Sequence, residues 1–359
     1  MKLDNRDKLV TWFCQNYKSY VDDMKNCSHF PEHRTNHPFH GEGSVWTHTM
    51  MVMTHIHCDM ELNVPDKQVL LTVALLHDVG KPASRQTKPL GEDDHKFSFE
   101  GHEGLSTYTA IDILNSMEKE DNFYSNSTRK LILELISLHG TSILYEEDTL
   151  EYKLQHRFRL ADKGGAIRNV DEDIFKQYPK RKVSNRRNVQ DDKVLWLMVG
   201  MPGSGKTKYI EDNFDDTHYI ISRDRYMDTF YYKRNPDSFG TETHNEIYAW
   251  INEEDNIVEF NAEFDLYINN AAKIHNKVVV DMTMLTAGKR RNILNRFSKF
   301  KANCVCILAG NKLINDVNDI RDTQDCGIPV ERLKTLKKKL LIPIKEEGFE
   351  RVIKILRNE

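Results

Sequence analysis

Apolar and polar residues follow two different periods along this chain. Over the first 165 residues, apolar side chains recur at intervals of three to four, for example within 9–13 and 70–76, which is typical of amphipathic helices. After residue 193, apolar residues instead form short continuous runs that indicate buried strands. We expect strands at 194–199, 219–222, 277–281, 304–308 and 352–356, and helical stretches at 241–275, 287–300 and 329–341.

This change of period predicts two domains. We expect an all-α helical bundle over residues 1–165 and an α/β domain with a parallel sheet over residues 194–359, because strands that alternate with helices form such sheets. The residues between them, 166–193, are polar and include basic clusters at 180–182 and 186–187. They are either a solvated linker or a basic strap that contacts nucleic acid.

Composition narrows the class of protein only slightly. The net charge of −4 gives no overall sign of nucleic-acid binding, so any such surface must be local. The six cysteines form no C-x-x-C pair and no dense framework, which indicates a reducing, cytoplasmic environment. We find no secretory signal pattern and no apolar run near the roughly 20 residues of a membrane span, so we expect no membrane association. The oligomeric state stays open.

One motif in the second part is specific. Residues 200–207 read G-x-x-x-x-G-K-T and lie between an apolar strand and a helix, which is the context of a phosphate-binding loop. Backbone amides of such a loop wrap phosphate oxygens, its lysine reaches the β- and γ-phosphates, and its threonine ligates Mg²⁺. We therefore expect ATP or another nucleoside triphosphate with Mg²⁺ to bind at Gly200, Gly203, Ser204, Gly205, Lys206 and Thr207.

Two aspartates are expected at the same edge of the sheet, because ligands bind at the carboxyl ends of parallel strands. Asp224 follows the strand at 219–222, where a kinase needs a base to accept the proton of an incoming hydroxyl; a helix cap is the alternative role. Asp281 ends the strand at 277–281 and either orders Mg²⁺ through water or holds an arginine.

The first part carries an ordered set of histidines and aspartates. His77, His139 and Asp162 each end an apolar helical segment, and helix ends of a bundle can converge on one site. Imidazole and carboxylate ligands suit Mn, Fe, Co, Ni and Zn, and an aspartate beside a histidine can bridge two ions that clamp a phosphate. We predict one or two divalent transition metals held by His48, His77, Asp78, His102, His139 and Asp162.

This set and its local contexts resemble the HD phosphohydrolase superfamily over roughly residues 35–170, most closely the HD domains attached to bacterial tRNA nucleotidyltransferases. The resemblance implies hydrolysis of phosphomonoesters or phosphodiesters, with Lys81 in contact with the scissile phosphate. It further implies two ions that share Asp78, one held with His48, His77 and Asp162 and the other with His102 and His139.

The second part is similar to the polynucleotide 5′-kinase family over most of residues 194–341, through its phosphate loop and the Ser-Arg-Asp and Asp-x-Thr motifs at two strand ends. The resemblance implies that Asp224 is the general base and that a lid arginine, here Arg321, contacts the phosphates. This chain has Met227 where the phage polynucleotide kinase carries an arginine, and Asp325 lies near the place of a second lid arginine. Possible replacements are Arg223, Arg225 and Arg332.

Together the two parts resemble the bifunctional end-healing enzymes of the HD-Pnk type. The resemblance implies an RNA or DNA end as substrate. The kinase phosphorylates a 5′-OH, the HD domain clears a 2′,3′-cyclic or terminal phosphate, and a separate ligase seals the ends. Two other functions stay open. One is a nucleotide-pool enzyme that joins a small-molecule kinase to a nucleotide phosphohydrolase, and the other is an ATP-sensing regulator with a degenerate HD scaffold.

Four more histidines crowd one loop ahead of this set. Their spacing matches no standard metal site. We expect an exposed loop at the edge of the substrate site, formed by His29, His33, His37 and His40.

Overall fold

The computed structural model describes residues 5–31, 41–90, 94–121, 124–141, 145–166, 189–324 and 326–357. The chain forms two compact units, which are treated separately: Met1–Lys182 with Lys337–Ile342, and Val183–Leu336 with Pro343–Glu359. The segment Lys337–Ile342, which we expected to belong with the second domain, therefore packs as part of the first unit. The expected linker at 166–193 falls mostly outside the described residues.

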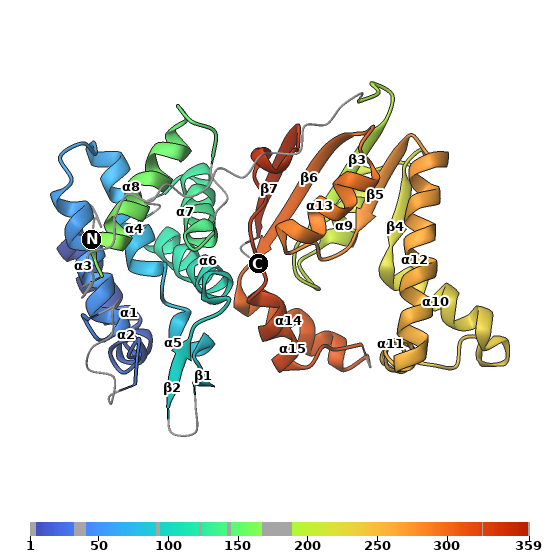
Figure 1. Cartoon of the computed structure of the whole chain (residues 1–359), viewed down its shortest axis with the longest axis horizontal. Coiled ribbons are helices and arrows are strands. Elements are labelled where there is room, and N and C mark those ends of the chain that lie inside the picture. Colours follow the sequence, from blue (N-terminus) through green and yellow to red (C-terminus); the bar gives the residue numbers. More distant parts are fainter. Residues whose placement is uncertain are drawn as a thin grey trace. The chain divides into compact units, whose positions relative to one another are not determined.

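The first unit is a helical bundle around α4, whose C-terminal half is buried on every side (Figure 1). Helix α4 contacts α1, α3, α6, α7 and α8, so its end lies among the other helices. No helix in the described ranges combines the length and apolar character needed to cross a membrane. The helices are α1 (Arg6–Asn16), α2 (Lys18–Lys25), α3 (Val45–Cys58), α4 (Val64–Leu76), α5 (Lys81–Ser84), α6 (His102–Asp121), α7 (Asn126–Leu138) and α8 (Leu150–Gly164).

Five of these helices begin at a polar side chain that caps them. The capping residues Asn5, Ser44, Asn63, Ser125 and Thr149 precede α1, α3, α4, α7 and α8, and each side-chain oxygen accepts a hydrogen bond from the backbone N–H three residues later. Such caps satisfy N–H groups that have no partner inside the helix. They therefore fix where each helix begins.

One hairpin interrupts the helical pattern. Strands β1 (Gln86–Pro89) and β2 (His95–Ser98) pair antiparallel. We did not expect strands here, because four-residue strands with mostly exposed or half-buried side chains carry too little alternation to detect.

The second unit contains the predicted parallel sheet. Its five strands lie in the order β4-β5-β3-β6-β7. Its central strand, β3, leads directly into the phosphate-loop motif (Figure 1). The strands are β3 (Val194–Val199), β4 (Tyr219–Ser222), β5 (Lys277–Asp281), β6 (Lys301–Ala309) and β7 (Arg351–Arg357). The helices are α9 (Lys206–Asn213), α10 (Arg223–Arg234), η1 (Pro236–Ser238), α11 (His244–Ile251), α12 (Glu254–Ile274), α13 (Ala287–Arg296), α14 (Asn311–Asp322), α15 (Val330–Lys337) and η2 (Lys345–Glu347).

All five expected strands are present, but the helix boundaries differ. The stretch expected at 241–275 is two helices, because Asn252 ends α11 and Glu253 is extended before α12 begins. The helices expected at 287–300 and 329–341 end earlier, at Arg296 and Lys337. Apolar residues beyond these ends are buried in non-helical segments, which explains why a helical pattern overran them.

Candidate active sites

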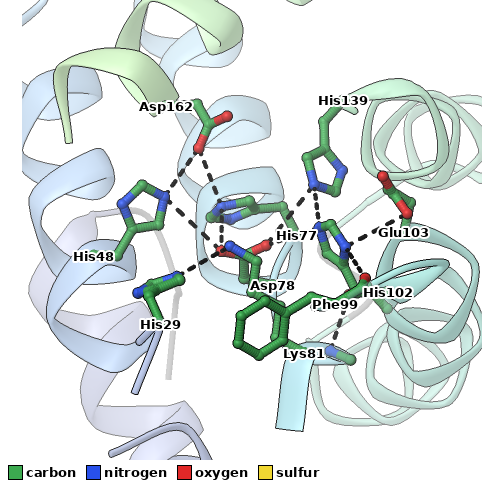
Figure 2. Close-up of polar contacts among 12 residues, drawn as sticks. His29, His48, His77, Asp78, Lys81, Phe99, His102, Glu103, His139 and Asp162 are labelled. Atoms are coloured by element: carbon green, nitrogen blue, oxygen red, sulfur yellow. Dashed lines mark hydrogen bonds and ion pairs between the residues drawn. The ribbon is translucent and has the colours of Figure 1, made fainter. Parts of the chain in front are cut away.

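The first unit brings together the side chains predicted to bind metal. They come from the ends of five helices and point toward one another (Figure 2). Ligand atoms of His48, His77 and Asp162 all lie within 4.8 Å of one another, and so do those of Asp78, His102 and His139. The two groups are called here the first and second trio. They differ from the sets expected for two metal ions in that Asp78, which we expected both ions to share, is a member of the second trio alone.

Asp78 belongs to the second trio and also contacts the first. Its Oδ2 is 3.2 Å from Nε2 of His77, and its Oδ1 is 3.3 Å from Nε2 of His102. Asp162 closes the first trio, with Oδ1 at 3.0 Å from Nε2 of His48 and 3.4 Å from Nε2 of His77. The two carboxylate oxygens of Asp78 therefore face histidines of different trios, which is the geometry a bridging carboxylate needs.

The backbone fixes the tautomers of three of the histidines. Nδ1 of His77, His102 and His139 each lies at hydrogen-bond distance from the carbonyl oxygen of the residue three positions earlier. A carbonyl only accepts, so each Nδ1 carries a hydrogen, and Nε2 of the neutral ring presents its lone pair to the site. The carbonyls belong to Ala74, Phe99 and Ile136, at 2.7, 2.8 and 2.6 Å.

Two histidines of the second trio lie so close together that a cation is needed between them. Nε2 of His102 lies 3.0 Å from Nε2 of His139. Since both Nδ1 atoms carry hydrogens, the two neutral rings direct lone pairs at each other, which is repulsive unless a proton or a metal ion lies between them. Imidazole nitrogens held by partners at Nδ1 are the usual ligands of transition metals. The residues therefore fit a divalent metal at each trio.

His48 is oriented by a side chain instead of the backbone. Its Nδ1 lies 3.1 Å from Oε1 of Glu42, whose side chain is fully buried. The carboxylate beside Nδ1 favours a hydrogen on that nitrogen, which leaves the Nε2 lone pair for the first trio. Sequence reasoning missed Glu42, because nothing in the local pattern distinguishes it from any acidic residue before a helix.

The charges of the cluster are strongly coupled. Burial disfavours the charged form of His77, but Asp78 and Asp162 outweigh it and raise its pKa to about 10. Burial, together with His102 and His77, lowers the pKa of His139 to about 4. Burial also disfavours the Asp78 carboxylate, but His77 and Lys81 hold its pKa well below the usual range. The carboxylates of Asp78 and Asp162 thus stabilise positive charge in the cluster, and a bound metal would supply that charge in place of a proton.

Lys81 lies at the edge of the cluster and is held on two sides. Its Nζ is 2.7 Å from Oδ2 of Asp78 and 3.1 Å from Nε2 of His29. Our expectation of an exposed loop is wrong for His29, which is only 5% exposed. The pairing was invisible in the sequence because 52 positions separate His29 from Lys81. The other histidines of that loop, His33, His37 and His40, lie outside the described residues.

In the second unit, the loop between β3 and α9 has the backbone of a phosphate-binding loop. Gly203 and Gly205 have φ of 77° and 94°, in the left-handed region that favours glycine. Lys206 begins α9 and is 9% exposed, and its Nζ donates to the carbonyls of Gly200 and Met201 at 3.2 and 2.9 Å. The buried hydroxyl-bearing Ser204 completes the loop.

The predicted acidic and basic partners gather around this loop. Thr207 Oγ1 lies 3.5 Å from Oδ2 of Asp281. Burial lowers the pKa of Lys206, Asp281 and Asp224 oppose this effect, and Arg321 reinforces it. Burial and the nearby Asp224 raise the pKa of Asp281. Asp224, Asp281 and Arg321 therefore each influence the charge of Lys206.

A further arginine meets the loop from the last strand. Arg357 ends β7, and its Nη1 donates to the carbonyl of Ser204 at 3.2 Å. A side chain at Gly205 would collide with this guanidinium. Sequence reasoning missed Arg357, although parallel strands end at one edge and the last strand was predicted.

The structure shows where the residues expected near the phosphate acceptor lie. Met227 is 1% exposed in α10, so it packs in the core and does not face a ligand. Two candidate replacements lie over aromatic rings: Arg223 is 4.6 Å from the ring centroid of Phe260, and Arg332 is 4.6 Å from that of Tyr248. Asp325 lies outside the described residues.

Comparison with known families finds one family model in each part of the chain. A family model described as an HD domain matches residues 45–163, and a model described as an AAA domain matches residues 195–340. No curated protein matches the chain. The chain thus combines a helical HD domain, which carries the His/Asp cluster, with an α/β domain of the P-loop kinase fold.

Proposed function

We propose that this protein is a bifunctional end-healing enzyme that acts on RNA ends. The α/β domain phosphorylates a 5′-OH with ATP, and the HD domain removes a 2′,3′-cyclic phosphate or a terminal 2′- or 3′-phosphate. A separate ligase then joins the ends. The observation that carries the proposal is the presence, in one chain, of a clustered His/Asp site for phosphate hydrolysis and a phosphate loop with an adjacent candidate base.

In the kinase reaction, Asp224 accepts the proton of the 5′-OH as that oxygen attacks the γ-phosphorus. The bond between the γ-phosphorus and the bridging oxygen breaks, and ADP leaves. Lys206 and Arg321 stabilise the charge on the phosphoryl oxygens, and Thr207 with Asp281 holds Mg²⁺. The electrostatic coupling of Asp224 and Arg321 to Lys206 supports this assignment.

In the hydrolase reaction, the six side chains of the two trios are the proposed metal ligands. When bound, divalent metals supply Lewis acidity and activate the attacking water. Asp78 links the two trios, the backbone and Glu42 hold the imidazole rings in their ligating tautomers, and Lys81 contacts the phosphate of the substrate. The buried position of Lys81 beside Asp78 supports its role.

One assay series tests both halves. It supplies 5′-OH oligonucleotides of RNA and DNA with labelled ATP, and 2′,3′-cyclic-phosphate oligonucleotides with Mn²⁺, Co²⁺ or Ni²⁺. Asp224→Ala should lower 5′-end labelling by about 10²- to 10⁴-fold and spare 3′-end hydrolysis. His77→Ala should do the reverse. Asp216→Ala and His57→Ala, two exposed positions, are the matched controls.

Four outcomes would contradict the proposal. If Asp224→Ala still labels 5′ ends at the full rate, Asp224 is not the general base. If His77→Ala loses 5′-end labelling but keeps 3′-end hydrolysis, the activities are assigned to the wrong domains. Equal turnover of mononucleotides and oligonucleotides would favour a nucleotide-pool enzyme. Unchanged metal-dependent activity in Asp78→Ala would favour a regulator with an inactive HD scaffold.

A further inference from the structure

We infer that His29 is a positioning residue for Lys81, which it holds at the Asp78 carboxylate as a cation for the substrate phosphate. This inference rests on the hydrolase function proposed for the same site. Lys81 Nζ lies between Oδ2 of Asp78 at 2.7 Å and Nε2 of His29 at 3.1 Å, with the ring centroid of Phe99 at 5.7 Å (Figure 2). Lys81 and His29 are 8% and 5% exposed, so the pair is enclosed by protein.

The direction of the hydrogen bond follows from the other ring nitrogen. Nδ1 of His29 lies 3.2 Å from the carbonyl oxygen of Gly43, which also accepts the backbone N–H of His29 at 3.0 Å. Because a carbonyl only accepts, Nδ1 carries the hydrogen, and Nε2 offers a lone pair. Nε2 therefore accepts a hydrogen bond from the Lys81 ammonium.

A neutral acceptor suits this place better than a second carboxylate. It holds the ammonium without cancelling its charge, so the cation stays available to an anionic substrate. An ammonium has three N–H donors. Among the described residues, Asp78 and His29 are the polar side chains within hydrogen-bond distance of Nζ, so they take two donors and leave the third for a phosphate oxygen.

The position of His29 is tied to the metal cluster through the backbone. Ser28 forms a β-bridge with Ser44, and the N–H of Val45 donates to Cys27 at 2.9 Å. Val45 begins α3, which carries His48, and the rings of His29 and His48 lie edge to face with centroids 5.6 Å apart. The segment that carries His29 is thus anchored to the first trio.

A metal-ligand role for His29 is the main alternative. Its Nδ1 is used by Gly43, and its Nε2 faces an ammonium, which no metal ion can share. His29 is also absent from both trios. The geometry therefore favours a contact to Lys81 over a contact to metal.

The test compares His29→Ala, His29→Gln, Lys81→Ala and the double variant His29→Ala/Lys81→Ala in the full-length, Mn²⁺-loaded protein. His57→Ala, an exposed histidine of α3, is the matched control. The substrate is an oligonucleotide with a 2′,3′-cyclic phosphate. Kinase activity on a 5′-OH oligonucleotide monitors the other domain, and metal content is measured for every variant.

We expect His29→Ala to raise KM about tenfold with unchanged metal content, because a hydrogen bond to a charged group is lost. His29→Gln should recover part of this loss, since its amide oxygen can accept from Lys81. The double variant should be no worse than Lys81→Ala alone, because His29 acts only through Lys81. A role in folding or metal binding would instead give additive losses and lower metal content.

Wild-type kinetics for His29→Ala, or additive losses in the double variant, would overturn the inference. If the wild type does not hydrolyse the substrate, the proposed function fails separately. The inference is then decided by the binding of inorganic phosphate to the Mn²⁺-loaded protein, measured by calorimetry. His29→Ala must weaken that binding about tenfold relative to His57→Ala, and equal binding by the two variants would refute it.

Discussion

Replacement of Glu42 tests whether the orientation of one imidazole sets metal affinity. His48 is the trio histidine whose Nδ1 faces a side chain in the described structure, whereas the other three face backbone carbonyls that substitution cannot remove. Glu42→Ala therefore removes one orienting partner and leaves every proposed ligand in place. Glu42→Gln keeps an acceptor at the same position but removes its charge.

The expected change in metal affinity follows from the direct contact between Glu42 and His48, whose Oε1 and Nδ1 atoms lie 3.1 Å apart. Partners of this kind change metal affinity by roughly 10- to 100-fold, which equals about 1.4 to 2.7 kcal/mol. Glu42→Ala should lower the metal affinity of the first trio by this amount, and Glu42→Gln should lower it by less. The second trio should be unaffected, because its rings are held by the backbone.

Competition with a chelating indicator dye measures the two affinities, and elemental analysis gives the number of ions per chain. At saturating Mn²⁺, hydrolysis by Glu42→Ala should approach the wild-type rate, because the ligands themselves are intact. An unchanged first-site affinity would refute the orienting role. Equal losses at both sites would mean that Glu42 acts on the fold of the whole cluster.

Three further predictions address packing and charge. Gly104→Ala should destabilise the first unit by about 1–3 kcal/mol, because a methyl group would overlap the Lys337 carbonyl; an unchanged Tm would contradict this. Arg290→Met should cost about 3–5 kcal/mol in urea unfolding, because Glu347 would stay buried without its bidentate partner, and adding Glu347→Leu should recover most of the loss. Metal affinity should fall as pH falls, because carboxylates overcome the effect of burial and raise the pKa of His77 to about 10, so its proton must leave. Calorimetry in buffers of different ionisation enthalpy should detect proton release on metal binding at pH 7.5, and no release would refute this.

The parallel sheet was predictable because its strands are buried on both faces. Val278, Val279 and Val280 are fully buried, and such strands read as continuous apolar runs instead of alternating ones. Helix ends were less predictable. Apolar spacing continues past Ile251 into α12, although Asn252 and Glu253 break the helix, because periodicity reports which residues are buried and not whether the backbone stays helical.

The clustering of the six histidine and aspartate side chains was predictable for a different reason than the contacts that support them. Histidine and aspartate at helix ends are unusual enough to stand out in one sequence. Glu42 and His29 are not, because their roles depend on which distant side chains they meet. His29 was even assigned to an exposed loop, since several histidines in sequence suggest solvent, whereas the fold buries this one against Lys81.

Histidines lie at helix ends for a physical reason, and a related reason applies to the phosphate loop of the second domain. The last carbonyls of a helix have no partner within it. In α4 and α7, the carbonyls of Ala74 and Ile136 are such groups, and the rings of His77 and His139 satisfy them. The same hydrogen bond that completes each helix therefore sets the tautomer that a metal ligand requires. At the start of α9 the opposite end of a helix is used, where unpartnered N–H groups and the dipole favour phosphate. Each domain thus builds its candidate site from backbone groups that its helices leave unpaired. Carbonyls of α4 and α7 orient the rings of His77 and His139, and the first N–H groups of α9 lie at the phosphate-loop motif.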